Sequence, residues 1–202
     1  MNTLAEMLTI FNENGLPAGV KDREDVHRDG DWHETFHCWM ISLEEKEIVL
    51  FLQQRSENKR DFPSLYDITA AGHIEAGEDV IEAGVREIKE EVGLTVHPAE
   101  LIHAGNYKEE LKQGVFIDRE ICRVYLYLYE GSANFQLGEE VEDLIRVSLD
   151  DMESLVEMNT PITGCSVVNG IEKEVKSEEF VPHEMEYGRF LIRAVHEHVT
   201  KL

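Results

Sequence analysis

The sequence predicts an α+β fold in which a mixed β-sheet is covered by helices on both faces. Two observations support this prediction: segments rich in β-branched and aromatic residues recur along the chain, and helical periodicity appears between some of them. The 202 residues include 42% hydrophobic residues, which is enough for one continuous core. We therefore expect a single domain over residues 1–202.

The expected strands are short segments in which β-branched, aromatic and aliphatic residues are frequent. They are residues 8–11, 35–43, 47–54, 66–71, 101–107, 119–129 and 144–149. The first is followed by Asn12, Glu13, Asn14 and Gly15, a composition typical of tight turns. This pattern predicts an N-terminal hairpin with its return strand near Gly19.

Three helices are expected. Ile81, Val85, Ile88 and Val92 recur at spacings of four, three and four, which places them on one stripe of a helix over residues 78–92. Gly93 is expected to end this helix. A short helix is predicted over 150–157 and a C-terminal helix over 185–199, each with apolar residues at helical spacing.

Composition excludes several partner classes. The formal net charge of −23 repels nucleic acid polymers and anionic membranes. A small phosphorylated substrate is repelled too unless Lys, Arg or a bound metal supplies local positive charge. No stretch approaches the roughly 20 apolar residues that span a bilayer, and the start of the chain lacks the pattern of a secretory signal. We expect a soluble cytoplasmic protein with three reduced cysteines and no CxxC motif.

A cluster of carboxylates indicates metal chemistry. Glu87, Glu90 and Glu91 stand at i, i+3 and i+4, so their side chains share one face of the expected helix. Like charges at these spacings repel by about 0.2–0.5 kcal/mol per pair on an isolated helix. A hard divalent cation removes that repulsion, and oxygen ligands favour Mg²⁺ or Mn²⁺. The alternative is a solvated acidic face in a chain that is acidic throughout.

The residues around this cluster form a longer motif. Gly72, Glu78 after five residues, then Arg86 and Glu87 after seven more, followed by Glu90, Glu91, Gly93 and Leu94, match the Nudix box at every position over 72–94. The chain therefore resembles the Nudix hydrolases, and the resemblance implies an α/β/α sandwich and the hydrolysis of a diphosphate linkage.

The resemblance also implies roles for the matching residues. Glu87, Glu90 and Glu91 match metal ligands, Glu78 a further acid at the metal site, and Gly72 a backbone position close to metal and phosphate. Arg86 matches the residue that holds a catalytic glutamate. We expect Glu87 to be the general base; the alternatives are three downstream acids, Glu139, Glu140 and Glu142.

A second resemblance lies upstream of the box. Residues 31–39 (DWHETFHCW), 52–56 (LQQRS) and Gly72-His73 are similar to the isopentenyl-diphosphate-isomerase-like branch of Nudix proteins. This resemblance implies that His33, His73, Gln54 and Arg55 bind substrate, or in the isomerases a metal through the two histidines. Those enzymes carry a proton-transferring cysteine two residues before the second histidine, where this chain has Ala71. A methyl group transfers no proton.

Three functions are compared at this point. The first is hydrolysis of a small nucleoside or prenyl diphosphate with Mg²⁺ or Mn²⁺, by a chain that forms a homodimer if it follows other members of the family. The second is an isopentenyl-diphosphate isomerase, against which Ala71 counts. The third is a non-catalytic ligand sensor, which has no need for the complete set of acids in the box.

Overall fold

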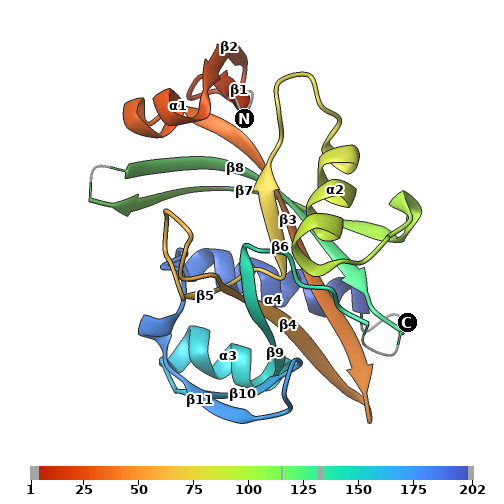
Figure 1. The fold of residues 1–202 in the computed structure, drawn as a ribbon. Helices are drawn as coiled ribbons and strands as arrows, with labels where there is room; N and C mark the ends of the chain where they lie inside the picture. Colours follow the sequence, from red (N-terminus) through yellow and green to blue (C-terminus); the bar gives the residue numbers. More distant parts are fainter. Residues whose placement is uncertain (1–4, 115, 132–133, 200–202) are drawn as a thin grey trace.

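The computed structural model describes residues 5–114, 116–131 and 134–199 (Figure 1). Its strands are β1 Met7–Phe11, β2 Pro17–Asp22, β3 Trp32–Glu44, β4 Glu47–Arg55, β5 Tyr66–Asp67, β6 Ala70–His73, β7 Leu101–Gln113, β8 Phe116–Leu128, β9 Val141–Ser148, β10 Ile162–Ser166 and β11 Glu172–Val175. Its α-helices are α1 Arg23–Asp29, α2 Val80–Val92, α3 Leu149–Met158 and α4 Met185–Val199.

The strands form one mixed sheet around the long strand β3. The main path runs β11-β10-β9-β4-β3-β1-β2, while β6 and β8 also pair with β3 and β7 pairs with β8. The β3 and β8 strands run parallel, and the other pairs of named strands are antiparallel. The expected mixed sheet is confirmed, and β3 pairs with four other strands, β1, β4, β6 and β8.

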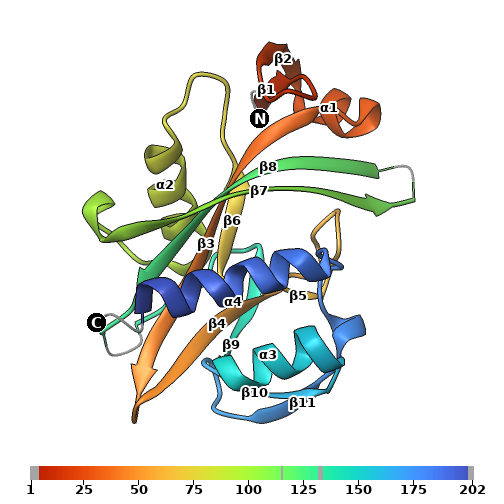
Figure 2. The ribbon, with the colours of Figure 1, turned by 180° about the vertical axis from the view of Figure 1, so that it is seen from behind.

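Helices cover both faces of the sheet, as the sequence predicts. The two faces follow from the alternation of side chains along each strand. On β3, Cys38 and Met40 belong to the core cluster under α2, whereas Trp39 and Ile41 belong to the cluster under α3 and α4. Figure 2 shows α4 lying across the sheet on the side opposite α2. The α/β/α sandwich is confirmed.

Helix α2 has well-defined ends. The Asp79 side chain accepts hydrogen bonds from the backbone N–H groups of Ile81 and Glu82, which satisfies donors at the helix start. At the other end Gly93 adopts the left-handed conformation with φ 75°. The helix therefore starts two residues later than predicted and stops where Gly93 predicts, so the acidic residues of its last turns are held on a rigid element.

Several expectations differ from the structure. The segment 66–71 is two short strands, β5 and β6, interrupted at Ile68 and Thr69. Five elements were not predicted: α1, β10, β11 and two 3₁₀ helices, Pro98–Glu100 and Ser177–Glu179. Each is short, so its pattern is too brief to distinguish from a loop. The C-terminal helix has the predicted bounds.

Among the described residues, no helix is both long and apolar enough to cross a membrane. The one-domain organisation over 1–202 stays a prediction, and the terminal residues 1–4 and 200–202 lie outside the described part.

Candidate active site

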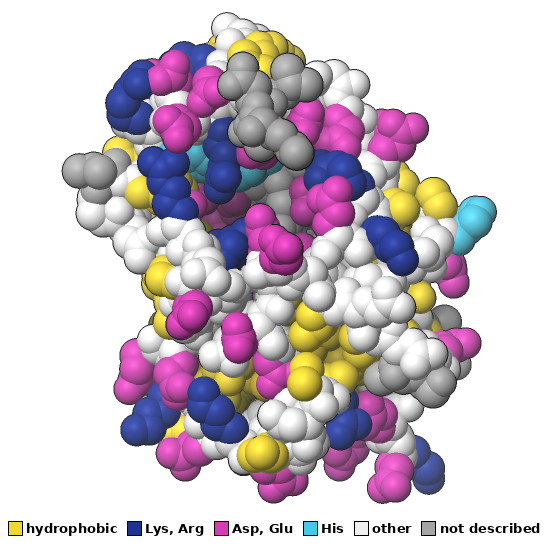
Figure 3. Space-filling model, in the orientation of Figure 1, with side chains coloured by type: hydrophobic (Ala, Val, Ile, Leu, Met, Phe, Trp, Pro, Cys, Tyr) yellow, Lys and Arg dark blue, Asp and Glu magenta, His cyan; other side chains and the backbone are white. Residues whose placement is uncertain are grey.

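A cavity of about 500 Å³ lies where the last turns of α2 face the sheet. Residues of α2, β3, β4, β6 and β8 line it, together with the loop after β4 and the segment before α4. Figure 3 shows the hollow in the upper half of the molecule, with acidic and basic side chains at its mouth and histidine inside. The described lining contains eleven carboxylate side chains and four from Lys or Arg. The cavity is therefore strongly acidic.

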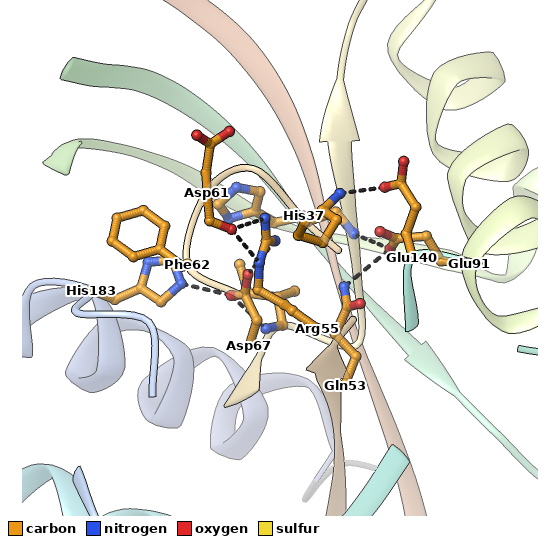
Figure 4. Close-up of polar contacts among 12 residues, drawn as sticks. His37, Gln53, Arg55, Asp61, Phe62, Asp67, Glu91, Glu140 and His183 are labelled. Carbon is orange, nitrogen blue, oxygen red and sulfur yellow. Dashed lines mark hydrogen bonds and ion pairs between the residues drawn. The ribbon is translucent and has the colours of Figure 1, made fainter. Parts of the chain in front are cut away.

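The structure brings the three box glutamates to this cavity in three different environments. Glu90 is exposed, with 61% of its side chain accessible, and Glu87 is mostly covered. Glu91 is buried at 4% exposure, where it accepts hydrogen bonds from the Gln53 side chain at 3.1 Å and the Ala71 backbone N–H at 2.9 Å (Figure 4). The three glutamates share one face of the helix as expected, but only Glu90 is exposed there, because the sheet edge covers Glu91.

Burial raises the affinity of two of these carboxylates for protons. It raises the pKa of Glu87 to about 7, against the opposing charge of the neighbouring Arg86. It raises the pKa of Glu91 to about 8, and the charge of Glu87 adds to the effect. These values refer to the metal-free protein. In the metal-free protein Glu87 and Glu91 therefore favour the protonated form. A cation bound nearby would stabilise their ionised form.

Arg86 connects the acids of the box. Its Nε and Nη2 donate to the two oxygens of Glu78, each at 3.0 Å, and its Nη1 donates to Glu87 at 2.6 Å. A weaker contact of 3.4 Å reaches Glu90. The paired hydrogen bonds to Glu78 fix the plane of the guanidinium, so Arg86 holds the Glu87 carboxylate in one position.

Gly72 leaves room for the Glu87 carboxylate. A Cβ at Gly72 would lie 2.1 Å from the Glu87 carboxyl carbon, which is far shorter than any contact between unbonded atoms. Because glycine has no side chain, the backbone of β6 approaches the acids of α2 closely. The resulting cradle, lined by carboxylate oxygens and backbone, has the donor chemistry of a hard divalent cation.

The downstream acids separate into two groups. Glu139 and Glu140 line the cavity, and Glu140 forms an ion pair with Lys59. Glu142 is exposed on β9 and does not line the cavity. Glu139 and Glu140 therefore face the cavity that holds the box glutamates, and Glu142 does not.

At the polar end of β4, the glutamine that contacts the site is Gln53 and not the predicted Gln54. Gln53 points to Glu91, whereas Gln54 is directed to the other side of the strand, where its amide lies 3.4 Å from the Ser64 carbonyl oxygen. Gln54 does not line the cavity. Arg55 does; its Nη1 donates to Asp67 at 3.0 Å, and its Nε and Nη2 donate to the carbonyl oxygen of Asp61. A bulge between residues 54 and 55 returns Arg55 to the side of Gln53.

His33 and His73 lie in a cluster that the sequence predicted only in part. His73 lines the cavity, but His33 is 0% exposed and lies behind it. His27 and Asp118 complete the cluster: the Nε2 atoms of His27 and His33 lie 3.4 and 3.3 Å from Asp118 Oδ1. None of these three atoms has a hydrogen-bond partner.

The opposite ring nitrogen of each histidine in this cluster has a partner. Nδ1 of His27 faces the Arg23 carbonyl oxygen, Nδ1 of His33 faces that of Asp31, and Nδ1 of His73 faces a Glu6 carboxylate oxygen. The Nε2 atoms of His27 and His33, buried without a hydrogen-bond partner, fit a metal cation. His27 escaped the sequence analysis because α1 was not predicted; Asp118 just precedes a predicted strand.

Comparison with known proteins decides the family. A family model described as NUDIX domain matches residues 31–163. The chain belongs to the Nudix family. An uncharacterised Nudix hydrolase of Clostridium acetobutylicum is 37% identical over 94% of this chain and 97% of its own length. This Nudix chain is accordingly a pyrophosphohydrolase of a family that generally requires a divalent metal.

Other Nudix relatives match a smaller share of the chain. An isopentenyl-diphosphate Delta-isomerase of Saccharopolyspora erythraea is 33% identical over 59% of this chain and 61% of its own length. Nudix hydrolase 3 of Arabidopsis thaliana is 36% identical over 60% of this chain, but the match spans only 16% of that protein. The similarity to the isomerase branch that the sequence indicates is thus confirmed.

Solved structures of Nudix proteins share the fold. A MutT/nudix family protein from Enterococcus faecalis superposes with a TM-score of 0.57 at 14% identity, over 83% of this chain and 62% of that one. A binary complex of the Caenorhabditis elegans Ap4A hydrolase gives a TM-score of 0.55 at 16% identity, over 84% and 98%. At these identities the similarity is one of fold.

Proposed function

We propose that this protein hydrolyses the diphosphate linkage of a small nucleoside or prenyl diphosphate with Mg²⁺ or Mn²⁺. Glu87, Glu90 and Glu91 would hold the cation, with Glu78 and the backbone at Gly72 beside it. The observation that carries the proposal is the convergence of Glu87, Glu90 and Glu91 on one cavity, where the missing side chain at Gly72 leaves the space that the Glu87 carboxylate occupies. Glu78 does not line the cavity and contacts the site through Arg86.

The charge of the cavity supports a metal-dependent reaction. Eleven carboxylates against four basic side chains repel a diphosphate, so the ligand does not enter without compensating cations. Arg23, Arg55 and Lys59 are the basic side chains on the wall facing the box. Each of these side chains already forms an ion pair with a carboxylate. A phosphate group that binds one of them takes the place of that carboxylate, so the basic side chain still pairs with an anion.

The chemistry then follows from the positions of the side chains. A divalent cation, when bound, neutralises the diphosphate and acidifies water. Glu87 is the proposed general base, since Arg86 fixes its carboxylate in one position at the cavity wall. Glu139 and Glu140, which also line the cavity, are the alternative bases. The two other glutamates of the box differ in their hydrogen bonds. Glu91 accepts hydrogen bonds from Gln53 and Ala71, whereas the exposed Glu90 can bind a cation without giving up such a bond.

The cluster of His27, His33, His73 and Asp118 favours a second candidate function, isomerisation of a prenyl diphosphate. It matches what the isomerase resemblance implies for a divalent metal at the two predicted histidines. Ala71 opposes this candidate: it lines the cavity, yet its side chain has no titratable group. We therefore propose that the histidine cluster serves substrate binding or metal binding in a hydrolase.

The test is a substrate panel assayed with and without metal. The panel contains isopentenyl diphosphate, ADP-ribose, nucleoside diphosphates and triphosphates and a dinucleoside polyphosphate, and release of phosphate or a monophosphate is measured. We expect hydrolysis of at least one compound with Mg²⁺ or Mn²⁺, and none in excess chelator. Full activity in chelator would reject the proposed mechanism.

A further inference from the structure

Four side chains outside the Nudix box converge at the wall of the cavity, and two of them, His37 and Glu120, line it. The four are His37, Glu109, Glu120 and Cys122, which are 2%, 1%, 8% and 0% exposed. One ligand atom from each lies within 4.8 Å of the others. Sequence analysis gave no sign of this cluster, because its members are distributed over three strands and Cys122 belongs to no CxxC motif.

Sheet register explains why they meet. Glu120 and Cys122 stand two residues apart on β8, so they share one face of the strand. Glu109 on β7 is directly opposite Glu120, and His37 comes from β3 on the other side of β8. Two buried carboxylates directly opposite each other on neighbouring strands repel unless positive charge lies between or beside them.

His183 supplies only part of that charge. Its Nδ1 lies 3.0 Å from Glu109 Oε1, while its Nε2 lies 2.9 Å from Asp67 Oδ1, so a second carboxylate shares the imidazolium. The other oxygen of Glu109, Oε2, is buried and has no hydrogen-bond partner among the described residues. A buried carboxylate oxygen without a partner is costly and indicates a missing ligand.

Three of the six distances between the ligand atoms match the edges of a tetrahedral coordination sphere, and the other three are within 4.8 Å. With bonds of about 2.0 Å to nitrogen or oxygen and about 2.3 Å to sulfur, tetrahedral ligand atoms stand about 3.3 Å (N and O) and about 3.5 Å (S and O) apart. His37 Nε2 lies 3.3 Å from Glu120 Oε2. Cys122 Sγ lies 3.6 Å from an oxygen of Glu120 and 3.6 Å from one of Glu109.

Neighbouring residues orient His37 in the way that is usual for a histidine that binds a metal, through a hydrogen bond to its other ring nitrogen. His37 Nδ1 lies 2.8 Å from the Tyr187 hydroxyl, and this contact orients the ring so that Nε2 points towards the carboxylates. The uncharged Thr35 hydroxyl also lies 3.2 Å from His37 Nε2. Thr35, His37 and Glu120 also line the cavity, so an ion has a route in. Figure 4 shows His37 and His183 beside this cavity.

We propose that His37, Glu109, Glu120 and Cys122 form a binding site for a zinc-class divalent cation, separate from the oxygen-only site of the Nudix box. One sulfur, one nitrogen and two oxygen ligands suit Zn²⁺, Co²⁺ or Fe²⁺ better than Mg²⁺. The site lies at the wall of the reaction cavity, where a cation would fix β3, β7 and β8 to one another and contribute positive charge to an acidic cavity. It goes beyond the proposed function and does not depend on it.

The test uses cobalt as a spectroscopic probe. The purified full-length protein is stripped with chelator and titrated with Co²⁺ alone, and the thiolate-to-cobalt charge-transfer band is followed in the near ultraviolet. Neither the box nor the histidine cluster contains sulfur, so a band reports a cysteine ligand. We expect the band to saturate at one equivalent and Zn²⁺ to displace it. We also expect plasma mass spectrometry after zinc loading to find one tightly bound zinc per chain that depends on this site, in addition to any zinc that the histidine cluster holds.

Matched variants identify the thiol. Cys38→Ser and Cys165→Ser are the controls and should retain the band, whereas Cys122→Ser should lose both the band and the tightly bound zinc. If Cys122→Ser does not fold, His37→Gln serves instead, with an expected loss of affinity for Co²⁺ of at least about tenfold. Glu90→Gln should keep the band, which separates this site from the box. Absence of the band in the wild-type protein, or its survival in Cys122→Ser, overturns the proposal.

Discussion

The backbone of Gly72 lies directly against the carboxylate of Glu87, so close that a methyl carbon at Gly72 would stand 2.1 Å from the Glu87 carboxyl carbon. Residue 72 belongs to β6 and residue 87 to α2, and the contact fixes the distance between the sheet edge and the acidic face of the helix. The first expected outcome follows from this contact.

Gly72→Ala should lower turnover by about 10–100-fold with a loss of stability below about 1.5 kcal/mol. The new methyl group displaces only the end of the flexible Glu87 side chain, so the fold is retained while the carboxylate leaves its position. Steady-state kinetics and thermal unfolding measure the two effects. Turnover equal to that of the wild-type protein would show that the position of Glu87 does not matter.

Gly84→Ala is the matched control for that experiment. Gly84 lies in the same helix, and a Cβ there would come within 2.2 Å of the Phe36 ring, which is fully buried. A rigid ring in a packed core yields less than a carboxylate, so we expect a loss of about 1–3 kcal/mol. Turnover per folded molecule should change much less than in Gly72→Ala.

Glu90→Gln should reduce turnover at least ~100-fold with an unchanged fold, because it removes a charged ligand from an exposed position of the helix. Glu82→Gln is the control: Glu82 is exposed in the first turn of α2 and does not line the cavity. Its activity should match the wild type. Near-normal activity of Glu90→Gln would contradict the proposed metal site.

Glu91→Gln should have opposite effects on activity and on metal-free stability. Turnover should fall at least ~100-fold, since the buried carboxylate is a proposed ligand. Burial raises the pKa of Glu91 from 4.5 to about 8 in the folded chain, so the folded state binds the proton more tightly than the unfolded state. The metal-free wild type should therefore lose stability as pH rises from about 4.5 to about 8.

The variant should lose less stability over that range, and at pH 8 it should exceed the metal-free wild type by about 1–3 kcal/mol. Denaturant unfolding in chelator at pH 5 and pH 8 measures this difference. A metal-free wild type that becomes more stable between these pH values would contradict the assigned environment of Glu91. Saturating Mg²⁺ should remove the advantage of the variant, because the cation binds the ionised wild-type carboxylate.

Isopentenyl diphosphate should not be converted to dimethylallyl diphosphate. Ala71 places a methyl group at the cavity wall, and proton transfer at that position needs a titratable side chain. Proton NMR of the reaction with Mg²⁺ distinguishes the isomer from hydrolysis products. Ala71→Cys is the informative partner variant, because it restores the missing thiol. Isomerisation by the wild type at a substantial rate would reverse the assignment.

The chain's local patterns predicted the part of the site that is local. Glu87, Glu90 and Glu91 share a face because helical spacing alone brings them together. Arg86 in the same helix contacts Glu87 and also Glu78, which precedes the helix. The fold class followed from alternating and helical patterns, and the structure and the family comparison confirm it. Elements of five to seven residues, such as α1 and β10, were missed because so few positions define no period.

What the sequence determined by itself was therefore the helix, its acids and the chemistry they favour. Only the tertiary structure decided that Glu91 is buried, that Gln53 rather than Gln54 contacts it, and which residues join His33. The same holds for His37, Glu109, Glu120 and Cys122, whose meeting depends on the register of β3, β7 and β8. Strand pairing brings together residues far apart in the sequence, and one residue of register moves a side chain to the opposite face.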